Sequence, residues 1–223
     1  MNKVIIDGNS LTIEDFINVV RKNYVVQLSE EAVERVTKSR EVVDKFVNEE
    51  KVVYGITTGF GKFSDVVISK DKTKKLQRNL IVSHACGVGE PLHEEIVRGI
   101  MLLRANALSK GFSGIRLSTL NTLLDMLNKG VHPVIPEKGS LGASGDLAPL
   151  AHMVLVMLGE GEAYYHGERM SGDKAMKLAG IPIVELTSKE GLALINGTQV
   201  MTSIGTLALY DSINLAKTAD IIS

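Results

Sequence analysis

The run GSLGASGDLAPL at residues 139–150 contains the residue types in this chain that are best suited to chemistry. Ala143, Ser144 and Gly145 are three of the smallest residues, and they let a backbone fold back on itself with little steric penalty. A glycine amide nitrogen can then attack the carbonyl two residues upstream, and loss of water would leave a conjugated, electron-poor ring. Such a ring is an electrophile that no ordinary side chain provides. The simpler alternative is a glycine-rich loop that leads into a helix.

Asp146 follows the tripeptide directly, at the point where a helix is expected to begin. An acidic residue in the first turn balances the positive end of a helix dipole. The same carboxylate could instead shape the loop or assist ring closure, and the two roles are compatible.

Tyr54 begins a second unusual run, YGITTGFG at residues 54–61, whose glycines predict an ordered or mobile loop. A tyrosine has a pKa of about 10, so it needs nearby donors or cations, or very good geometry, to act as a base at neutral pH. Elimination of ammonia from an amino acid needs both an electrophile for the amine and a base for the β-proton. The alternative for Tyr54 is a core position beside a turn.

Two further polar residues are candidates for substrate contacts. His84 lies four residues after Leu80 and eight after Leu76, which places all three on one helical face. An imidazole there suits an imidazole ligand through hydrogen bonding, although a lone histidine on an apolar face is often a core residue. Asn196 precedes Gly197, and this pair is also a common turn.

Apolar periodicity and capping residues predict mostly helical structure between these runs. A strand is expected at residues 4–6 and a hairpin at 163–170, with Thr187 and Glu190 in a capping-box pattern. The predicted fold class is mainly α with minor β. Helices are expected from Thr12 and at residues 30–48, 73–85, 96–109, 117–127, 146–158 and from 198 to the last residue.

Composition narrows the possible partners and compartment. The net charge of −1 gives no reason to expect nucleic acid or an anionic membrane as a partner. No stretch approaches the roughly 20 apolar residues of a membrane-spanning helix. The single cysteine, Cys86, excludes an intrachain disulfide framework and favours a reducing compartment. The expected location is the cytoplasm, and scattered histidines predict no metal site.

Three runs of this sequence resemble motifs of the histidine and aromatic amino-acid ammonia-lyase family, and they follow one another along the chain in the same order as in that family. They are GASGD at residues 142–146, YGITTGFG at 54–61 and GLALINGT at 191–198. The resemblance implies the helical, fumarase/aspartase-like lyase fold. It also implies a prosthetic group, 4-methylidene-imidazol-5-one (MIO), formed autocatalytically from Ala143, Ser144 and Gly145 with support from Gly142 and Asp146. No metal is expected.

The same resemblance assigns the remaining candidate residues. Tyr54 would remove the β-proton, His84 would contact the substrate side chain, and Asn196 would contact the ring and the bound amino acid. The match is closest to the bacterial histidine branch, which implies conversion of L-histidine to trans-urocanate and ammonia in histidine catabolism. Thr57 departs from that branch, where asparagine is usual. It leaves open a tyrosine or phenylalanine ammonia-lyase, or an aminomutase.

Length is a second departure, because family members are more than twice as long as these 223 residues. Residues 1–223 are therefore expected to be an amino-terminal, prosthetic-group-forming domain that ends inside a long helix. Alone it is expected to be inactive, and to act in a homotetramer of the full-length form or with a carboxyl-terminal half. The alternative is a non-catalytic assembly module of a split enzyme.

Overall fold

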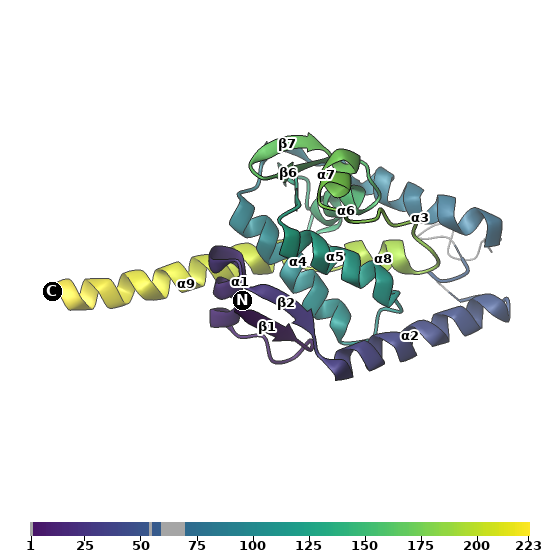
Figure 1. The fold of residues 1–223 in the computed structure, drawn as a ribbon, viewed down its shortest axis with the longest axis horizontal. Helices are drawn as coiled ribbons and strands as arrows, with labels where there is room; N and C mark the ends of the chain where they lie inside the picture. The colour runs from purple at the N-terminus through teal and green to yellow at the C-terminus, as the bar shows by residue number, and fades with distance from the viewer. Residues whose placement is uncertain (1, 54, 59–69) are drawn as a thin grey trace.

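The computed structural model of the chain describes residues 2–53, 55–58 and 70–223, without the side chains of residues 70–72. Helices dominate the described residues, which confirms the predicted fold class of mainly α with minor β (Figure 1). The helices are α1 (Ile13–Lys22), α2 (Glu30–Asn48), α3 (Lys70–His84), α4 (Glu94–Ser109), α5 (Leu117–Lys129), α6 (Leu147–Met157), α7 (Gly172–Leu178), α8 (Glu190–Ile195) and α9 (Gln199–Ile222).

Short strands lie at the edges of this helical body. The strands are β1 (Lys3–Ile6), β2 (Val25–Leu28), β3 (Val88–Pro91), β4 (His132–Pro133), β5 (Pro136–Lys138), β6 (Glu162–Tyr165) and β7 (Glu168–Ser171). β1 and β2 are parallel, whereas β3 pairs with β5 and β6 pairs with β4 and β7 in antiparallel fashion. His166 and Gly167 turn the β6–β7 hairpin with φ of 51° and 80°, as the sequence predicted. Figure 1 shows the β1–β2 pair and the β6–β7 hairpin on opposite sides of the helices.

Local capping explains where several helices begin and end. Thr12 and Asp15 form a capping box at the start of α1, and Ser29 caps α2 by accepting a hydrogen bond from the Ala32 amide. Gly130 ends α5 in the left-handed conformation at φ 75°, where glycine carries little steric cost. The starts of α1 and α2 confirm the helix starts that the sequence predicted there.

The helix α4 forms the centre of the molecule and packs against α1, α5 and α9. Its buried side chains include Ile100, Leu102 and Leu108, all with no exposed surface. At Gly99 a methyl group would lie 2.6 Å from the Phe16 ring of α1 and 2.2 Å from the Ser203 hydroxyl of α9. A glycine is required there because three helices approach one another closely.

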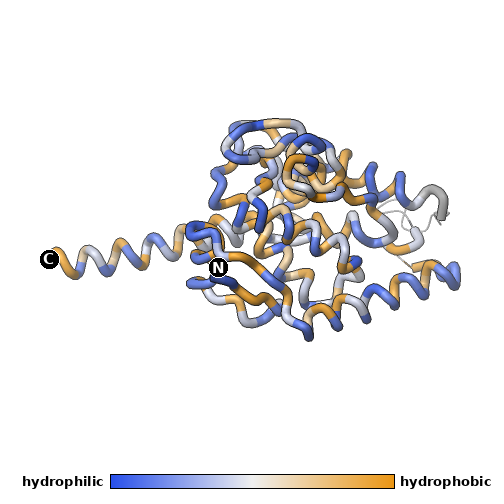
Figure 2. Tube along the Cα trace, viewed as in Figure 1, coloured by the Kyte–Doolittle hydropathy of each residue, from blue (hydrophilic) through white to orange (hydrophobic). Residues whose placement is uncertain are grey.

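The last helix, α9, extends beyond the body over much of its length (Figure 1). Its first half packs on α4 through the buried side chains of Val200, Ser203 and Leu207. The projecting part alternates apolar and polar positions (Figure 2). The exposed large apolar residues of α9 as a whole are Met201, Ile204, Leu209, Ile213, Leu215, Ile221 and Ile222.

The segment Glu190–Ile222 is long and apolar enough to cross a membrane by length and composition alone. The expectation that no stretch approaches this length was therefore wrong, because no charged residue lies between Glu190 and Asp211. A single helix of this kind is weak evidence for a membrane span, since core helices pass the same test. In this structure Val200, Ser203 and Leu207 are buried against α4, and residues 211–223 are exposed.

A buried carboxylate joins α5 to the start of α8. Glu190 has no exposed surface and accepts hydrogen bonds from the Arg116 guanidinium at 2.6 Å, the Thr119 hydroxyl at 2.7 Å and the Thr187 amide at 2.9 Å. Burial alone would raise the pKa of this carboxyl, but the hydrogen bonds outweigh it and hold the pKa below its ordinary value. One half of the predicted Thr187–Glu190 capping box forms, because Glu190 accepts from the Thr187 amide, but Lys189 rather than Thr187 occupies the N-cap of α8.

We predict that Glu190→Gln lowers the free energy of unfolding by about 2–3 kcal/mol, because the neutral amide cannot accept from all of these donors. Urea unfolding would measure the loss. The matched control is Glu162→Gln, at an ion pair with Arg169 in which the two side chains are 50% and 46% exposed. That change should cost less than about 1 kcal/mol. Equal losses in the two variants would contradict the role assigned to Glu190.

Candidate active site

The tripeptide at residues 143–145 lies in the loop between β5 and α6. Gly142 and Gly145 adopt φ of 77° and 118°, conformations that glycine reaches without strain. Ala143 and Ser144 are exposed, whereas Gly145 is buried. The loop therefore presents two residues of the tripeptide to solvent and anchors the third.

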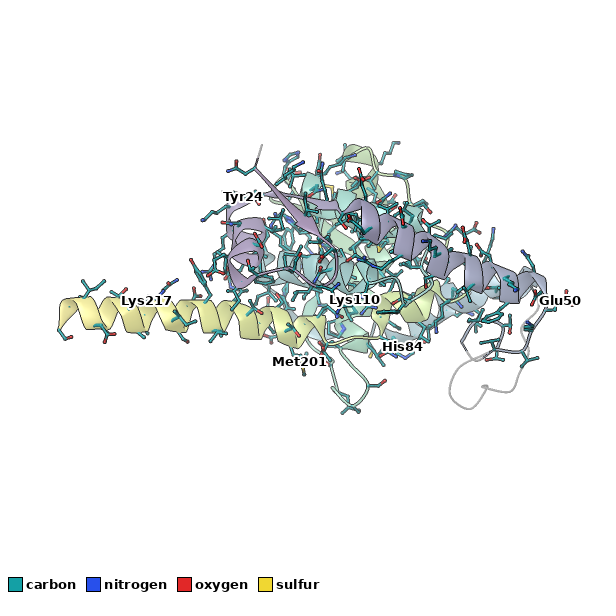
Figure 3. The ribbon with its side chains drawn as sticks, turned by 90° about the horizontal axis from the view of Figure 1, so that it is seen from below. Tyr24, Glu50, His84, Lys110, Met201 and Lys217 are labelled. Atoms are coloured by element: carbon teal, nitrogen blue, oxygen red, sulfur yellow. The ribbon has the colours of Figure 1, made fainter. Side chains whose placement is uncertain are left out.

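The tripeptide and His84 line one pocket of about 250 Å³. His84 is the last residue of α3, and the pocket also includes Ser83, Cys86, Gly139, Leu141, Leu147 and Ala148. The structure thus brings together two sequence candidates that lie about sixty positions apart in the chain. Figure 3 shows His84 on the same side of the molecule as Met201, near the point where α9 begins.

A hydrogen bond to the backbone determines which ring nitrogen of His84 can act as an acceptor. Nδ1 lies 2.8 Å from the Leu80 carbonyl oxygen, which can only accept a hydrogen bond. Nδ1 therefore carries the proton in the neutral ring. Nε2 is then left as an acceptor, the atom that an N–H or O–H donor on a bound molecule would need.

Asp146 lies at the start of α6, as the sequence predicted, and its side chain binds groups outside that helix. It occupies the N-cap of α6, but its side chain makes no capping bond to that helix. Instead its Oδ2 accepts hydrogen bonds from the amides of Val200 and Met201, at 3.0 and 3.1 Å, in the first turn of α9. Its Oδ1 accepts from the Ser140 hydroxyl at 2.9 Å. Of the two compatible roles expected for Asp146, these hydrogen bonds favour the one in which the carboxylate shapes the loop, and they add a cap on a distant helix.

The turn between α8 and α9 lies directly against the tripeptide. The Asp146 amide donates to the Gly197 carbonyl at 2.6 Å. A methyl group at Gly145 would lie 2.6 Å from that same carbonyl oxygen, so only glycine permits this approach. Asn196, the preceding residue, is exposed. The structure therefore places Asn196 next to a residue that contacts the tripeptide, although Asn196 is not among the residues that line the pocket.

Arg104 of α4 supports this turn from the inner side and was not predicted. Its guanidinium donates to the Asn196 carbonyl at 3.1 Å, to the Gln199 Oε1 at 2.9 Å and to the Ala193 carbonyl. The side chain is only 4% exposed, and burial lowers its pKa to about 10. An arginine within an otherwise apolar helical stretch was the signal available in the sequence.

His152 is the second functional candidate that sequence reasoning missed. It lies on α6, and its Nε2 accepts a hydrogen bond from the Gly87 amide at 3.0 Å. Burial lowers the pKa of His152, which favours the neutral ring that this acceptor role requires. Its hydrogen bond holds the segment that follows His84 against the helix that follows the tripeptide.

Tyr54, the predicted base, lies outside the described residues, as do residues 59–61 of the same run. Of its neighbours, Thr57 accepts from the Val53 amide at 2.9 Å, and Thr58 accepts from the Gly55 amide at 3.2 Å. Among the described residues, no group of three or more His, Cys, Asp or Glu side chains is arranged to hold a metal ion.

The family described as aromatic amino acid lyase matches residues 11–223. A histidine ammonia-lyase of Alkaliphilus oremlandii is 73% identical over 99% of this chain. A solved histidine ammonia-lyase from Trypanosoma cruzi is 42% identical over 98% of this chain and 43% of its own, with a TM-score of 0.93. A tyrosine aminomutase from Streptomyces globisporus is 38% identical over 99% of this chain and 41% of its own, with a TM-score of 0.92. The chain spans 44% of the length of the Alkaliphilus relative.

We predict that Asp146→Asn loosens both the loop and the start of α9. The amide keeps the size of the carboxylate but loses one acceptor oxygen, which should cost about 1–3 kcal/mol. Hydrogen exchange should become faster at residues 140–146 and at the Met201 amide. The control is Asp125→Asn, at an exposed position of α5. Unchanged exchange at both segments would contradict this role.

Proposed function

Because the chain belongs to the aromatic amino acid lyase family, we propose that the protein containing it eliminates ammonia from L-histidine and releases trans-urocanate. The observation that carries this proposal is the pocket in which His84 lies beside residues 143–145. Its Nε2 is an acceptor that suits the N–H of a substrate imidazole. The high identity to relatives named histidine ammonia-lyase supports the same substrate.

The tripeptide has the features that MIO formation requires. The Gly145 nitrogen would bond to the Ala143 carbonyl carbon, whose oxygen leaves as water with the amide protons of Gly145 and Ser144. A second water takes the Ser144 hydroxyl and its α-proton. Two exposed residues beside a tightly held Gly145 fit this closure, and Gly142 gives the loop its left-handed bend. When formed, the group supplies the electrophile that makes the substrate amine a leaving group.

The other proposed roles belong to side chains around this group. Tyr54 would take the β-proton, which requires a pKa below its ordinary value of about 10 or a well-placed proton acceptor. Asn196 would contact the bound amino acid, and His84 would orient its imidazole. Asp146 would hold the loop during ring closure through its bonds to α9.

A second candidate activity is a tyrosine or phenylalanine ammonia-lyase, or an aminomutase. Thr57 favours it, because the family resemblance associates threonine at this position with those enzymes. A neighbour of similar fold is named a tyrosine aminomutase. A non-catalytic assembly module remains a third candidate, and the tripeptide and Asn196 that this chain retains weigh against it.

The whole protein is proposed to extend well beyond these residues, since relatives are more than twice as long. Residues 1–223 would form the amino-terminal part that carries the prosthetic group, and activity would need the carboxyl-terminal part. A cytoplasmic homotetramer without nucleic-acid or membrane partners is the proposed form. The exposed apolar residues of α9 support further helix packing in that assembly.

Intact mass of the denatured full-length protein tests the electrophile. We expect a mass two water molecules below that calculated from the sequence, with the loss located in the peptide that holds residues 143–145. Ser144→Ala should remove the loss of the second water and the turnover of histidine. Ser118→Ala, at an exposed position of α5, is the control and should behave as the wild type. Full mass together with no turnover of histidine, tyrosine or phenylalanine would refute the lyase proposal.

Substrate choice is tested at His84. We expect His84→Leu to lower kcat/KM for histidine at least about tenfold, because the variant loses an acceptor worth about 1–3 kcal/mol. Turnover of phenylalanine should not fall in parallel, since its ring has no hydrogen to donate there. His166→Asn is the control, because it lies at the hairpin turn and asparagine tolerates its φ of 51°. A parallel fall for all substrates would contradict a contact between His84 and imidazole.

A further inference from the structure

The helix α4 carries two buried arginines that donate hydrogen bonds to different parts of the structure. Arg98 and Arg104 are both 4% exposed, and in each the Nε atom has no hydrogen-bond partner among the described residues. Arg98 donates to the Val19 carbonyl at 2.7 Å and to His132 at 3.0 Å, within the core near β4. Arg104 instead donates to groups on both sides of the break between α8 and α9.

A buried guanidinium is costly, because removing a charge from water costs several kcal/mol unless paired groups offset it. In the part of the chain that the structure describes, no carboxylate lies within ion-pair distance of Arg104. Its compensation comes from the carbonyls of Ala193 and Asn196, at the end of α8, and from the Gln199 amide oxygen at the start of α9. One planar group therefore fixes the relative position of the two helix ends.

The turn that Arg104 fixes is the one that contacts the tripeptide. A methyl group at Gly197 would lie 2.2 Å from the Arg104 Nη1, and one at Gly145 would lie 2.6 Å from the Gly197 carbonyl oxygen. Gly197 is thus packed tightly between Arg104 on one side and Gly145 on the other. The Gly197 carbonyl also accepts the Asp146 amide at 2.6 Å. A shift of the turn would move the anchored end of the tripeptide.

We propose that Arg104 is a positioning residue for the reaction, acting through the Asn196–Gly197 turn. This inference rests on the proposed lyase function. By holding Gly197 against Gly145, Arg104 fixes the end of the loop whose nitrogen must reach the Ala143 carbonyl carbon. By binding the Asn196 carbonyl, it also sets the place of the side chain proposed to contact the substrate. Both effects follow from geometry, and Arg104 need not touch the substrate.

The paired arginines provide a test in the full-length protein. Arg104→Gln and Arg98→Gln both remove a buried cation of α4 that holds neighbouring carbonyls, so both should lower the Tm. Only Arg104→Gln should reduce the rate at which the two waters are lost, measured by intact mass after synthesis, by about tenfold or more. In the fraction that has matured, kcat for histidine should fall about tenfold, and in Arg98→Gln it should stay within about twofold of wild type.

Arg104→Lys keeps the positive charge and the burial but cannot reach all three acceptors at once. It is the milder variant if Arg104→Gln does not fold, and its maturation rate should lie between those of Arg104→Gln and the wild type. Equal maturation and equal kcat in the Arg104 and Arg98 variants, at equal loss of Tm, would overturn the proposal.

Hydrogen exchange separates this inference from the lyase proposal. In the Arg104 variants the amides of Asp146 and Met201 should exchange faster than in the matched Arg98 variants, whether or not the ring forms. A wild-type protein that keeps its full mass would count against ring formation alone. Unchanged exchange at both amides in the Arg104 variants would count against the positioning role alone.

Discussion

The candidate site depends on the hydrogen bonds between the Asp146 carboxylate and the first amides of α9. A helix leaves its first amides without partners inside the helix, and a carboxylate from elsewhere in the chain can satisfy them. Here that carboxylate follows the tripeptide directly, and its own amide binds the Gly197 carbonyl. The loop therefore cannot move without disturbing the helix that packs on α4. A flexible run of glycines is in this way held by the core of the molecule.

That core is rigid because α4 meets α1 and α9 at Gly99, where an added methyl group would clash with both neighbours. The same helix supplies Arg104, whose position is set by apolar packing along α4. Packed interiors do not deform continuously, so a residue fixed in such a helix transmits its position to the groups that it binds. The helix α4 thus holds Arg104, Arg104 holds the turn at Gly197, and this turn packs against Gly145.

Much of the fold could be predicted from local sequence, and much of the site could not. The helix start at Thr12 and the helix at residues 30–48 depend on neighbours within one or two turns, and the structure confirms both. The α9 amides that Asp146 binds lie more than fifty positions away, as do the turn that Arg104 binds and the Gly87 amide that His152 binds. Sequence periodicity does not indicate pairings at that distance, so the sequence predicted neither the bonds of Asp146 to α9 nor the roles of Arg104 and His152.

The hydrogen bond from His84 to the Leu80 carbonyl affects which substrates the pocket can distinguish. Because Nδ1 binds a carbonyl, the neutral ring of this pocket-lining residue has one remaining acceptor, Nε2. An imidazole N–H and a phenol O–H can each donate to it, whereas a phenyl ring cannot. Under the proposed function this acceptor distinguishes histidine from phenylalanine, because only histidine has a donor on its ring. Histidine and tyrosine both have such a donor, so the acceptor distinguishes them only by where that donor lies. The departure at Thr57 therefore bears most directly on tyrosine as the rival substrate.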